Sequence, residues 1–194
     1  MTIIKLPAPD FKGPASVEEA LKNRRSVRKF KSYKISLKEI SQLLWAAYGV
    51  TEETNKFKTT PSAGATYPLE IYYFTSEGIF YYLPYEHSVK NLSQRDLRKE
   101  LAEAALNQQF ITEAAIDIII CAVYERTTLY YGERGYRYVY MEAGHCAQNI
   151  SLQAISLGLD SVCVGAFYDE KVKKILDLKG DIYPIYIIAV GKKM

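Results

Sequence analysis

Three arginines lie close together in the segment RRSVR, Arg24–Arg28, directly after an expected short helix. Guanidinium groups this close repel one another, and most such charge runs are solvated surfaces. The other explanation is an anion site, because arginine binds phosphate groups and anionic rings through paired, charge-assisted hydrogen bonds. On that interpretation the candidate contacts are Arg24, Arg25, Ser26 and Arg28.

Three other segments could approach the same kind of ligand. The loop PSAGATYP lies between two prolines, and its small residues would let the backbone come close to a flat molecule; its candidates are Pro61, Ser62, Ala63 and Gly64. The segment SVCVGAF contains a glycine with the same property, at Val164 and Gly165. A basic pair follows the last expected strand, at Lys192 and Lys193. Each segment alone has an ordinary explanation as a loop or a basic tail, but all four occur in one chain.

Several common catalytic motifs are missing from the sequence. It contains no GxGxxG turn, no GxxxxGK[ST] loop and no GxSxG elbow. It therefore lacks a Rossmann-type phosphate turn and a P-loop, and its two histidines make a Ser or Cys triad hard to assemble. The three cysteines form no CxxC pair, so we expect buried, reduced thiols, and without clustered ligands we expect no metal site.

The elements that must position these residues predict an α+β fold. Capping-box spacings, Ser16 with Glu19 and Ser36 with Glu39, predict helices over 16–24 and 36–49. The other expected helices cover 93–109 and 169–178, the last capped by Asp169. Strands are expected over 69–74 and 79–85, which form an antiparallel hairpin, and over 117–124, 161–167 and 183–190. Residues 125–137 are too polar for the core and are expected to form a loop or a helix entrance.

The segment from Tyr136 to Asp160 is expected to form one long helix. Apolar residues recur there at steps of three and four, and Gly158 suits the left-handed position that ends a helix. One row carries only the small residues Ala143, Gly144 and Ala147, so another helix could approach closely. Because few charges interrupt this helix, we expect it to be buried on most sides, with a second subunit covering one of them.

Composition limits the kind of protein this is. At 194 residues, with 48% hydrophobic and 24% charged residues, we expect one globular domain over 15–194, preceded by an extended arm over 1–14 that holds three of the seven prolines. The net charge of +3 and its scattered basic residues argue against a nucleic-acid-binding face and are compatible with one small anionic ligand. No apolar run reaches the roughly 18 residues of a spanning helix, and no leader pattern is present, so we expect a cytoplasmic protein with no membrane partner.

In combination, these motifs resemble a known family. RRSVRKF, PSAGATYPLEIYYF with GIFYYLPYEHSVKNL after it, MEAGHCAQNISLQAISLGLDSVCVGAF and a terminal PIYIIAVGKK are similar to the flavin-dependent nitroreductases, in the right order from about residue 16 to the end. The PSAGxxYPLE segment and the Tyr-x-Pro-x-x-His spacing look most like the SagB-type branch, which includes azoline dehydrogenases of peptide-toxin biosynthesis.

The resemblance implies an α+β homodimer that binds FMN at the subunit interface, with the long helix at its centre. The Arg24–Arg28 segment would contact FMN, and Lys192 and Lys193 would reach its phosphate. The loop Pro61–Gly64 would approach the flavin from the partner subunit, and Val164 and Gly165 would place backbone N–H groups near the flavin N5.

The resemblance also implies a reaction: NAD(P)H gives a hydride to FMN, the nicotinamide leaves, and a small organic acceptor takes its place. Arg28 or a nearby cation would stabilise negative charge on the reduced ring. No side chain needs to act as acid or base in the first half-reaction, so no catalytic residue is named. Tyrosines and arginines in 126–138 are candidates for the acceptor pocket.

Three alternatives stay open. The protein could be an azoline dehydrogenase that oxidises peptide thiazolines or oxazolines together with a partner enzyme. It could bind FMN without turnover, as a flavin carrier or redox sensor. The weakest alternative is an anion-binding dimer without flavin, which rests only on the arginine segment.

Overall fold

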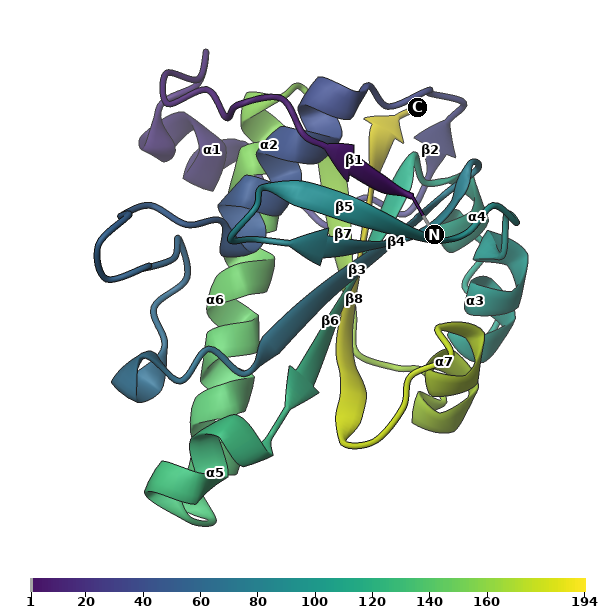
Figure 1. The fold of residues 1–194 in the computed structure, drawn as a ribbon. Coiled ribbons are helices and arrows are strands. Elements are labelled where there is room, and N and C mark those ends of the chain that lie inside the picture. The colour runs from purple at the N-terminus through teal and green to yellow at the C-terminus, as the bar shows by residue number, and fades with distance from the viewer. Residues whose placement is uncertain (1) are drawn as a thin grey trace.

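The computed structural model describes residues 2–194 and is built on one antiparallel sheet (Figure 1). The strands are β1 (Ile3–Lys5), β2 (Phe30–Lys31), β3 (Leu69–Thr75), β4 (Gly78–Leu83), β5 (Ser88–Ser93), β6 (Ile116–Val123), β7 (Asp160–Val164) and β8 (Ile182–Lys193). Their order is β1-β5-β4-β3-β6-β8-β2, and β7 pairs with β8 on a separate branch. The expected α+β fold, an antiparallel sheet flanked by helices, is confirmed.

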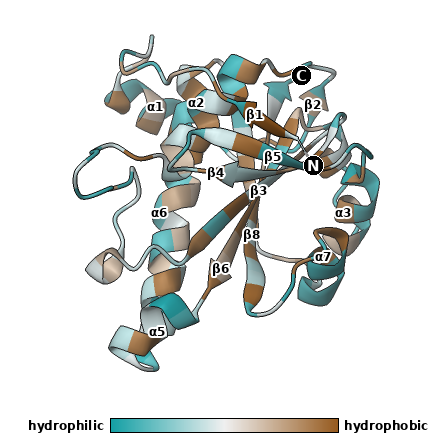
Figure 2. Ribbon diagram, in the orientation of Figure 1, coloured by the Kyte–Doolittle hydropathy of each residue, from teal (hydrophilic) through white to brown (hydrophobic). Residues whose placement is uncertain are grey.

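Helices cover both faces of the sheet. They are α1 (Val17–Asn23), α2 (Leu37–Tyr48), α3 (Arg98–Ala104), α4 (Phe110–Glu113), α5 (Glu125–Tyr131), α6 (Arg134–Ser156) and α7 (Asp169–Ile175), and a short 3₁₀ turn, η1, spans Ala63–Ala65. One core lies between the sheet and α2 with α6, and the other lies under α3, α4 and α7. Strand β6 serves both, because Ile118 and Ile120 face the first core and Ile119 faces the second. Its continuous apolar run is thereby explained. Figure 2 shows hydrophilic residues over much of the visible surface of α3 and α7.

The two capping boxes are confirmed. The hydroxyl of Ser16 accepts from the N–H of Glu19 at 3.1 Å, and the Glu19 carboxylate accepts from the N–H of Ser16 at 2.8 Å. Ser36 and Glu39 repeat the pattern at 3.2 and 2.8 Å. The β3–β4 hairpin is also confirmed, with Tyr73 opposite Phe80.

Several predicted boundaries are wrong. No helix spans 93–109: Ser93 ends β5, which sequence patterning missed, and α3 begins only at Arg98, after polar side chains of Ser93 and Asp96 accept backbone N–H groups. Leu106 and Asn107 then adopt left-handed φ angles of 57° and 60°, which a continuing helix excludes.

Three smaller corrections concern the second half of the chain. Residues 125–131, expected as a loop or helix entrance, form the separate helix α5. Asp169 is the first residue of α7 and not its cap, because Tyr168 holds the cap position without a side-chain bond. The predicted strand 79–85 ends at Leu83, where Pro84 begins a turn.

The long helix α6 is confirmed, but in the single chain it is open along one face. Val139, Cys146, Ile150 and Ala154 are fully buried, and Gly158 follows the helix with φ of 67°. An exposed stripe of Met141, Gly144, His145 and Gln148 runs along the other side. Within residues 2–194, no helix is long and apolar enough to cross a bilayer.

The segment expected as an N-terminal arm is attached to the rest of the domain. Strand β1 pairs with β5, and the carbonyl of Pro7 accepts from Ser41 at 2.6 Å. The Gln42 side chain bonds both backbone groups of Asp10, at 2.8 and 3.0 Å.

Candidate functional site

The arginine segment is fixed to the sheet through its backbone. Helix α1 ends at Asn23, and the chain then runs beside the start of β7, where the N–H of Val27 donates to the carbonyl of Ser161 at 3.0 Å and Ser26 forms a parallel bridge with Ser161. The backbone is therefore ordered while the side chains point outward: Arg24 is half-buried, and Arg25, Ser26 and Arg28 are exposed.

The C-terminal lysines lie next to this segment. Strand β2 pairs with the end of β8, so that Phe30 lies opposite Lys193 and Lys31 lies opposite Lys192. Tertiary structure thus brings together two basic segments from opposite ends of the chain. We call Arg24, Arg25, Arg28, Lys192 and Lys193 the basic cluster.

The basic cluster forms no ion pair in the described chain. Among residues 2–194, no carboxylate lies within 4 Å of its cationic groups. Two members have other contacts: the Arg25 guanidinium donates to the carbonyls of Lys22 at 2.9 Å and Arg24 at 2.7 Å, and the Lys192 Nζ lies 5.4 Å from the ring centre of Tyr33, with its charge acting on the Glu39 carboxylate. Cations without ion pairs favour a bound anion, and phosphate is a group that the planar guanidinium of arginine binds well.

Gly165 lies at the far end of β7 from the basic cluster. It is exposed directly after Val164, which pairs with Ile187 of β8. A Cβ added there would meet only the ring of Tyr186, at 3.8 Å, so packing within the chain does not require glycine. From Ser161 to Gly165 the strand advances about 13 Å. An elongated ligand could therefore reach from the cations to this open backbone.

The loop Pro61–Gly64 lies elsewhere. Gly64 has φ of 59°, and a Cβ there would be 2.7 Å from the hydroxyl oxygen of Tyr131 in α5. The N–H of Tyr67 donates to the Ser62 hydroxyl at 2.9 Å. Ser62 also faces Glu142 on α6. The loop thus rests on α5 and the N-terminal half of α6, in the lower part of Figure 1.

The candidate residues of one chain therefore form two separate groups. The basic cluster follows α1, which contacts α6, and Gly13 before α1 packs close to Ser156 near the C-terminal end of α6; Gly165 lies about 13 Å further along β7. Glu142 and Ser156 are about 21 Å apart along the axis of α6. The structure brings together three of the four predicted segments, and Pro61–Gly64 is not among them.

Sequence reasoning missed the polar residues beneath this loop. The hydroxyl of Tyr48 donates to Glu142 at 2.6 Å, and both side chains are buried. Burial raises the pKa of Glu142, and hydrogen bonds from Ser62 and Tyr48 partly offset the rise. Burial lowers the pKa of Lys58 to about 8. The signal in the sequence that could have identified this group is Glu142, a carboxylate on an otherwise apolar face of the long helix.

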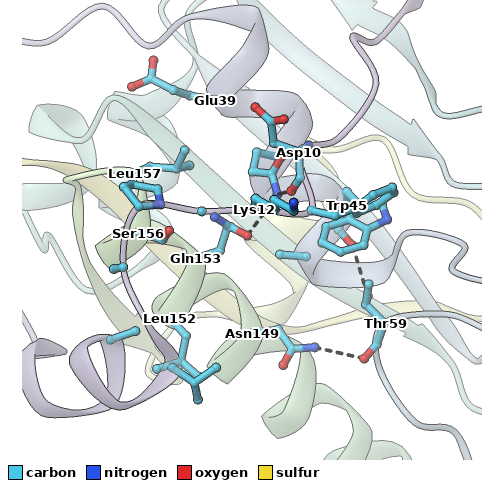
Figure 3. A pocket seen from close by; sticks show the side chains of 18 of the residues that line it. Asp10, Lys12, Glu39, Trp45, Thr59, Asn149, Leu152, Gln153, Ser156 and Leu157 are labelled. Carbon is cyan, nitrogen blue, oxygen red and sulfur yellow. Dashed lines mark hydrogen bonds between the residues drawn. The ribbon is translucent and has the colours of Figure 1, made fainter.

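A cavity of about 540 Å³ lies between residues 10–17, α2 and α6 (Figure 3). Trp45, Leu152 and Gln153 line it, and Phe11 packs on Trp45 with ring centres 5.4 Å apart. None of the predicted site residues lines this cavity.

Comparison with known proteins places these features in context. Residues 21–192 match the nitroreductase family. A protein of Methanocaldococcus jannaschii named as a nitroreductase is 51% identical over 184 residues, which cover 92% of this chain and 91% of that protein. The crystal structure of a protein named as a nitroreductase from Ralstonia eutropha JMP134 superposes with a TM-score of 0.89 at 27% identity, covering 99% of this chain and 90% of that one.

A more distant similarity concerns a longer protein. The microcin B17-processing protein McbC of Escherichia coli is 25% identical over 158 residues, which cover 75% of this chain and 57% of McbC. The chain thus spans little more than half the length of that relative.

Proposed function

Because the chain belongs to the nitroreductase family, we propose that it is an FMN-dependent oxidoreductase that transfers hydride from NAD(P)H to a small organic acceptor. The observation that carries the proposal is a basic cluster that forms no ion pair among residues 2–194, about 13 Å from the open backbone at Gly165. That arrangement fits a ligand with a phosphate at one end and a flat ring at the other.

Each part of the site has a role in this proposal. Arg24 and Arg28 bind the phosphate with Lys192 and Lys193, while Arg25 and Ser26 shape the segment and add polar contacts. The backbone at the end of β7, where buried Val164 is followed by exposed Gly165, faces the ring and donates N–H groups to it. FMN, when bound, supplies the hydride-accepting and hydride-donating chemistry. The protein supplies orientation and positive charge.

A second copy of the chain would complete the site. The loop Pro61–Gly64 lies about 21 Å along α6 from the basic cluster, too far to share its ligand within one chain. Antiparallel pairing of α6 across a two-fold axis near residue 149 would bring position 142 of one copy opposite position 156 of the other. The exposed stripe of Met141, Gly144, His145 and Gln148 lies close to that axis and includes no Asp, Glu, Lys or Arg. We therefore propose a homodimer with two equivalent sites.

A second candidate function is supported by the similarity to McbC. A SagB-type azoline dehydrogenase would use the same bound FMN to oxidise a thiazoline or oxazoline ring in a peptide. It would accept hydride from the peptide and would not depend on NAD(P)H. An FMN carrier without turnover is a third outcome that the same experiment separates.

The visible absorbance spectrum of the purified protein tests these functions. We expect flavin bands that bleach on anaerobic addition of NADH or NADPH and return with oxygen, while free FMN with the same nucleotide serves as the control. Flavin bands that persist would favour the dehydrogenase, to be tested with an azoline-containing peptide, or the carrier. A colourless protein that does not bind added FMN would overturn the proposal.

A further inference from the structure

A lysine beneath the Pro61–Gly64 loop is enclosed by three aromatic rings. The Nζ of Lys58 lies 4.0 Å from the ring centre of Tyr48, 4.7 Å from that of Tyr67 and 4.9 Å from that of Tyr85. Cation–π attraction acts over this distance and strengthens as the cation loses water. Lys58 is half-buried and forms no ion pair within 4 Å among residues 2–194. The cage therefore holds a cation mainly through aromatic faces.

The three rings come from separate parts of the fold. Tyr48 ends α2, Tyr67 follows the Pro61–Gly64 loop, and Tyr85 lies in the turn between β4 and β5. The N–H of Lys58 also donates to the Tyr67 hydroxyl at 3.3 Å. One side chain thus links the segment before the loop to the segment after it, and both to the sheet.

The residues between Lys58 and the loop are clamped to the helices. Thr60 donates from its hydroxyl to the carbonyl of Ala47 at 2.7 Å, and Thr59 donates to Trp45 at 3.1 Å. Asn149 on α6 donates to the carbonyl of Thr59 at 3.3 Å, as drawn in Figure 3. Beyond the cage, residues 51–57 are mostly exposed. Lys58 therefore lies at the junction between the exposed residues 51–57 and the residues that are hydrogen-bonded to α2 and α6.

The charges around Lys58 come from three elements. Glu142 and Cys146 face it from α6, Glu70 from β3 and Arg126 from α5. Glu70 is already paired with Arg126 at 2.5 Å. Burial raises the pKa values of Cys146 and Tyr48, which keeps both groups neutral near pH 8. At pH 7 Lys58 keeps its ammonium charge, because burial lowers its pKa only to about 8.

We propose that Lys58 is a positioning residue, whose caged ammonium group holds the Pro61–Gly64 loop in the shape that meets the flavin. The proposal rests on the proposed function for its effect on FMN. Its structural half, that the charge of Lys58 orders the loop, is independent of any cofactor. Lys58 acts through the loop and does not itself touch the ligand.

The first test measures the loop in the protein freed of FMN. Hydrogen exchange of backbone amides over 57–67 is compared in the wild type, Lys58→Met and Lys58→Arg. We expect faster exchange in Lys58→Met and near wild-type exchange in Lys58→Arg, because a guanidinium also binds aromatic faces. Lys56→Met is the matched control, since Lys56 lies in the neighbouring exposed segment 51–57 and its ion pair is with Glu53. Equal exchange in folded Lys58→Met and wild type would overturn the proposal.

The second test measures the FMN dissociation constant at pH 7. Lys58→Met should bind about tenfold more weakly than the wild type, because it removes the cation and keeps an unbranched apolar chain. Lys58→Arg should bind about as tightly as the wild type, because a guanidinium also binds aromatic faces. Wild-type affinity in Lys58→Met, or equal losses in Lys58→Met and Lys58→Arg, would overturn the proposal.

The two tests separate two kinds of failure. Wild-type protein that never binds FMN would defeat the proposed function while leaving the exchange result to decide the role of Lys58. FMN binding with no difference among the variants, together with unchanged exchange, would defeat the role of Lys58 alone. Circular dichroism spectra that match the wild type would show that each variant is folded.

Discussion

The basic cluster and the Pro61–Gly64 loop are two parts of the proposed site that are built in opposite ways. The cluster carries charged side chains on an ordered backbone, and these side chains form no ion pair among residues 2–194. The loop carries small residues, and beneath it Tyr48 donates a hydrogen bond to Glu142 while Tyr48 also packs on Lys58. Charged side chains can be recognised as candidates from their residue types, whereas the residues that support a backbone loop come from elsewhere in the chain.

The largest expected effect comes from removing a charge of the cluster. Arg24→Ala and Arg28→Ala should each weaken FMN binding about 10- to 100-fold, because a charge-assisted hydrogen bond contributes roughly 1.5–3 kcal/mol. Arg25→Ala should cost less, since its guanidinium also bonds the carbonyls of Lys22 and Arg24. Fluorescence titration of FMN measures all three.

Lys99→Ala is the control for these variants. Lys99 is exposed on α3, on the opposite face of the sheet from α6, and its loss removes the same formal charge without touching the cluster. Unchanged flavin content in both Arg24→Ala and Arg28→Ala would show that these arginines do not bind the FMN phosphate, and the contrast between the basic cluster and the loop would then fail.

Beneath the loop, the corresponding loss should appear first in stability. Glu142→Ala leaves the buried Tyr48 hydroxyl without its acceptor, which should lower the free energy of unfolding by about 2 kcal/mol. Glu142→Gln keeps a hydrogen-bonding oxygen and should lose less. Urea denaturation measures the free energy of unfolding of both variants. Equal decreases in the two variants would mean that the hydrogen bond to Tyr48 does not account for the lost stability.

The same pair of proteins gives a pH signature. The pKa of Glu142 is raised in the fold, chiefly by burial, so below about pH 4.5 the carboxyl is protonated in both states and costs nothing. As pH rises above that value the unfolded chain ionises first, which lowers the stability of the wild type. Glu142→Gln escapes this loss, so its stability relative to wild type should increase between pH 4 and pH 7. A difference independent of pH would contradict the assignment.

The smallest effects distinguish two glycines. Gly64→Ala should cost about 1 kcal/mol of stability, because an alanine is strained at φ of 59° and its Cβ would press on Tyr131. Gly165→Ala should leave stability unchanged, since 3.8 Å separates the added Cβ from Tyr186, yet it should weaken FMN binding. Thermal melts measure the stability of both variants, and FMN titration measures their affinity. If Gly165→Ala is as destabilising as Gly64→Ala, the proposed difference between the two glycines is wrong.

Local signals in the sequence predicted much of the fold. The capping boxes at Ser16 and Ser36, the hairpin and the long helix with Gly158 after it all depend on residues near one another in the chain. The failures occur where the local signal is weak and tertiary contacts decide the structure. Strand β5, with the sequence SVKNLS, carries too little apolar pattern to be recognised, because it gains its order by pairing with β4 and β1.

By itself, the sequence predicted which residue types could form the proposed phosphate-and-ring site, and it predicted most of the helices and strands that carry them. Only the tertiary structure decided how they combine. Pairing of β2 with β8 put Lys192 beside the arginine segment, and the rigid length of α6 held the Pro61–Gly64 loop away from both. Lys58 and Glu142 gained their altered pKa values in the same way. Burial is the largest cause of both shifts, and nearby charges and hydrogen bonds modify them; all of these arise from contacts between residues far apart in the chain.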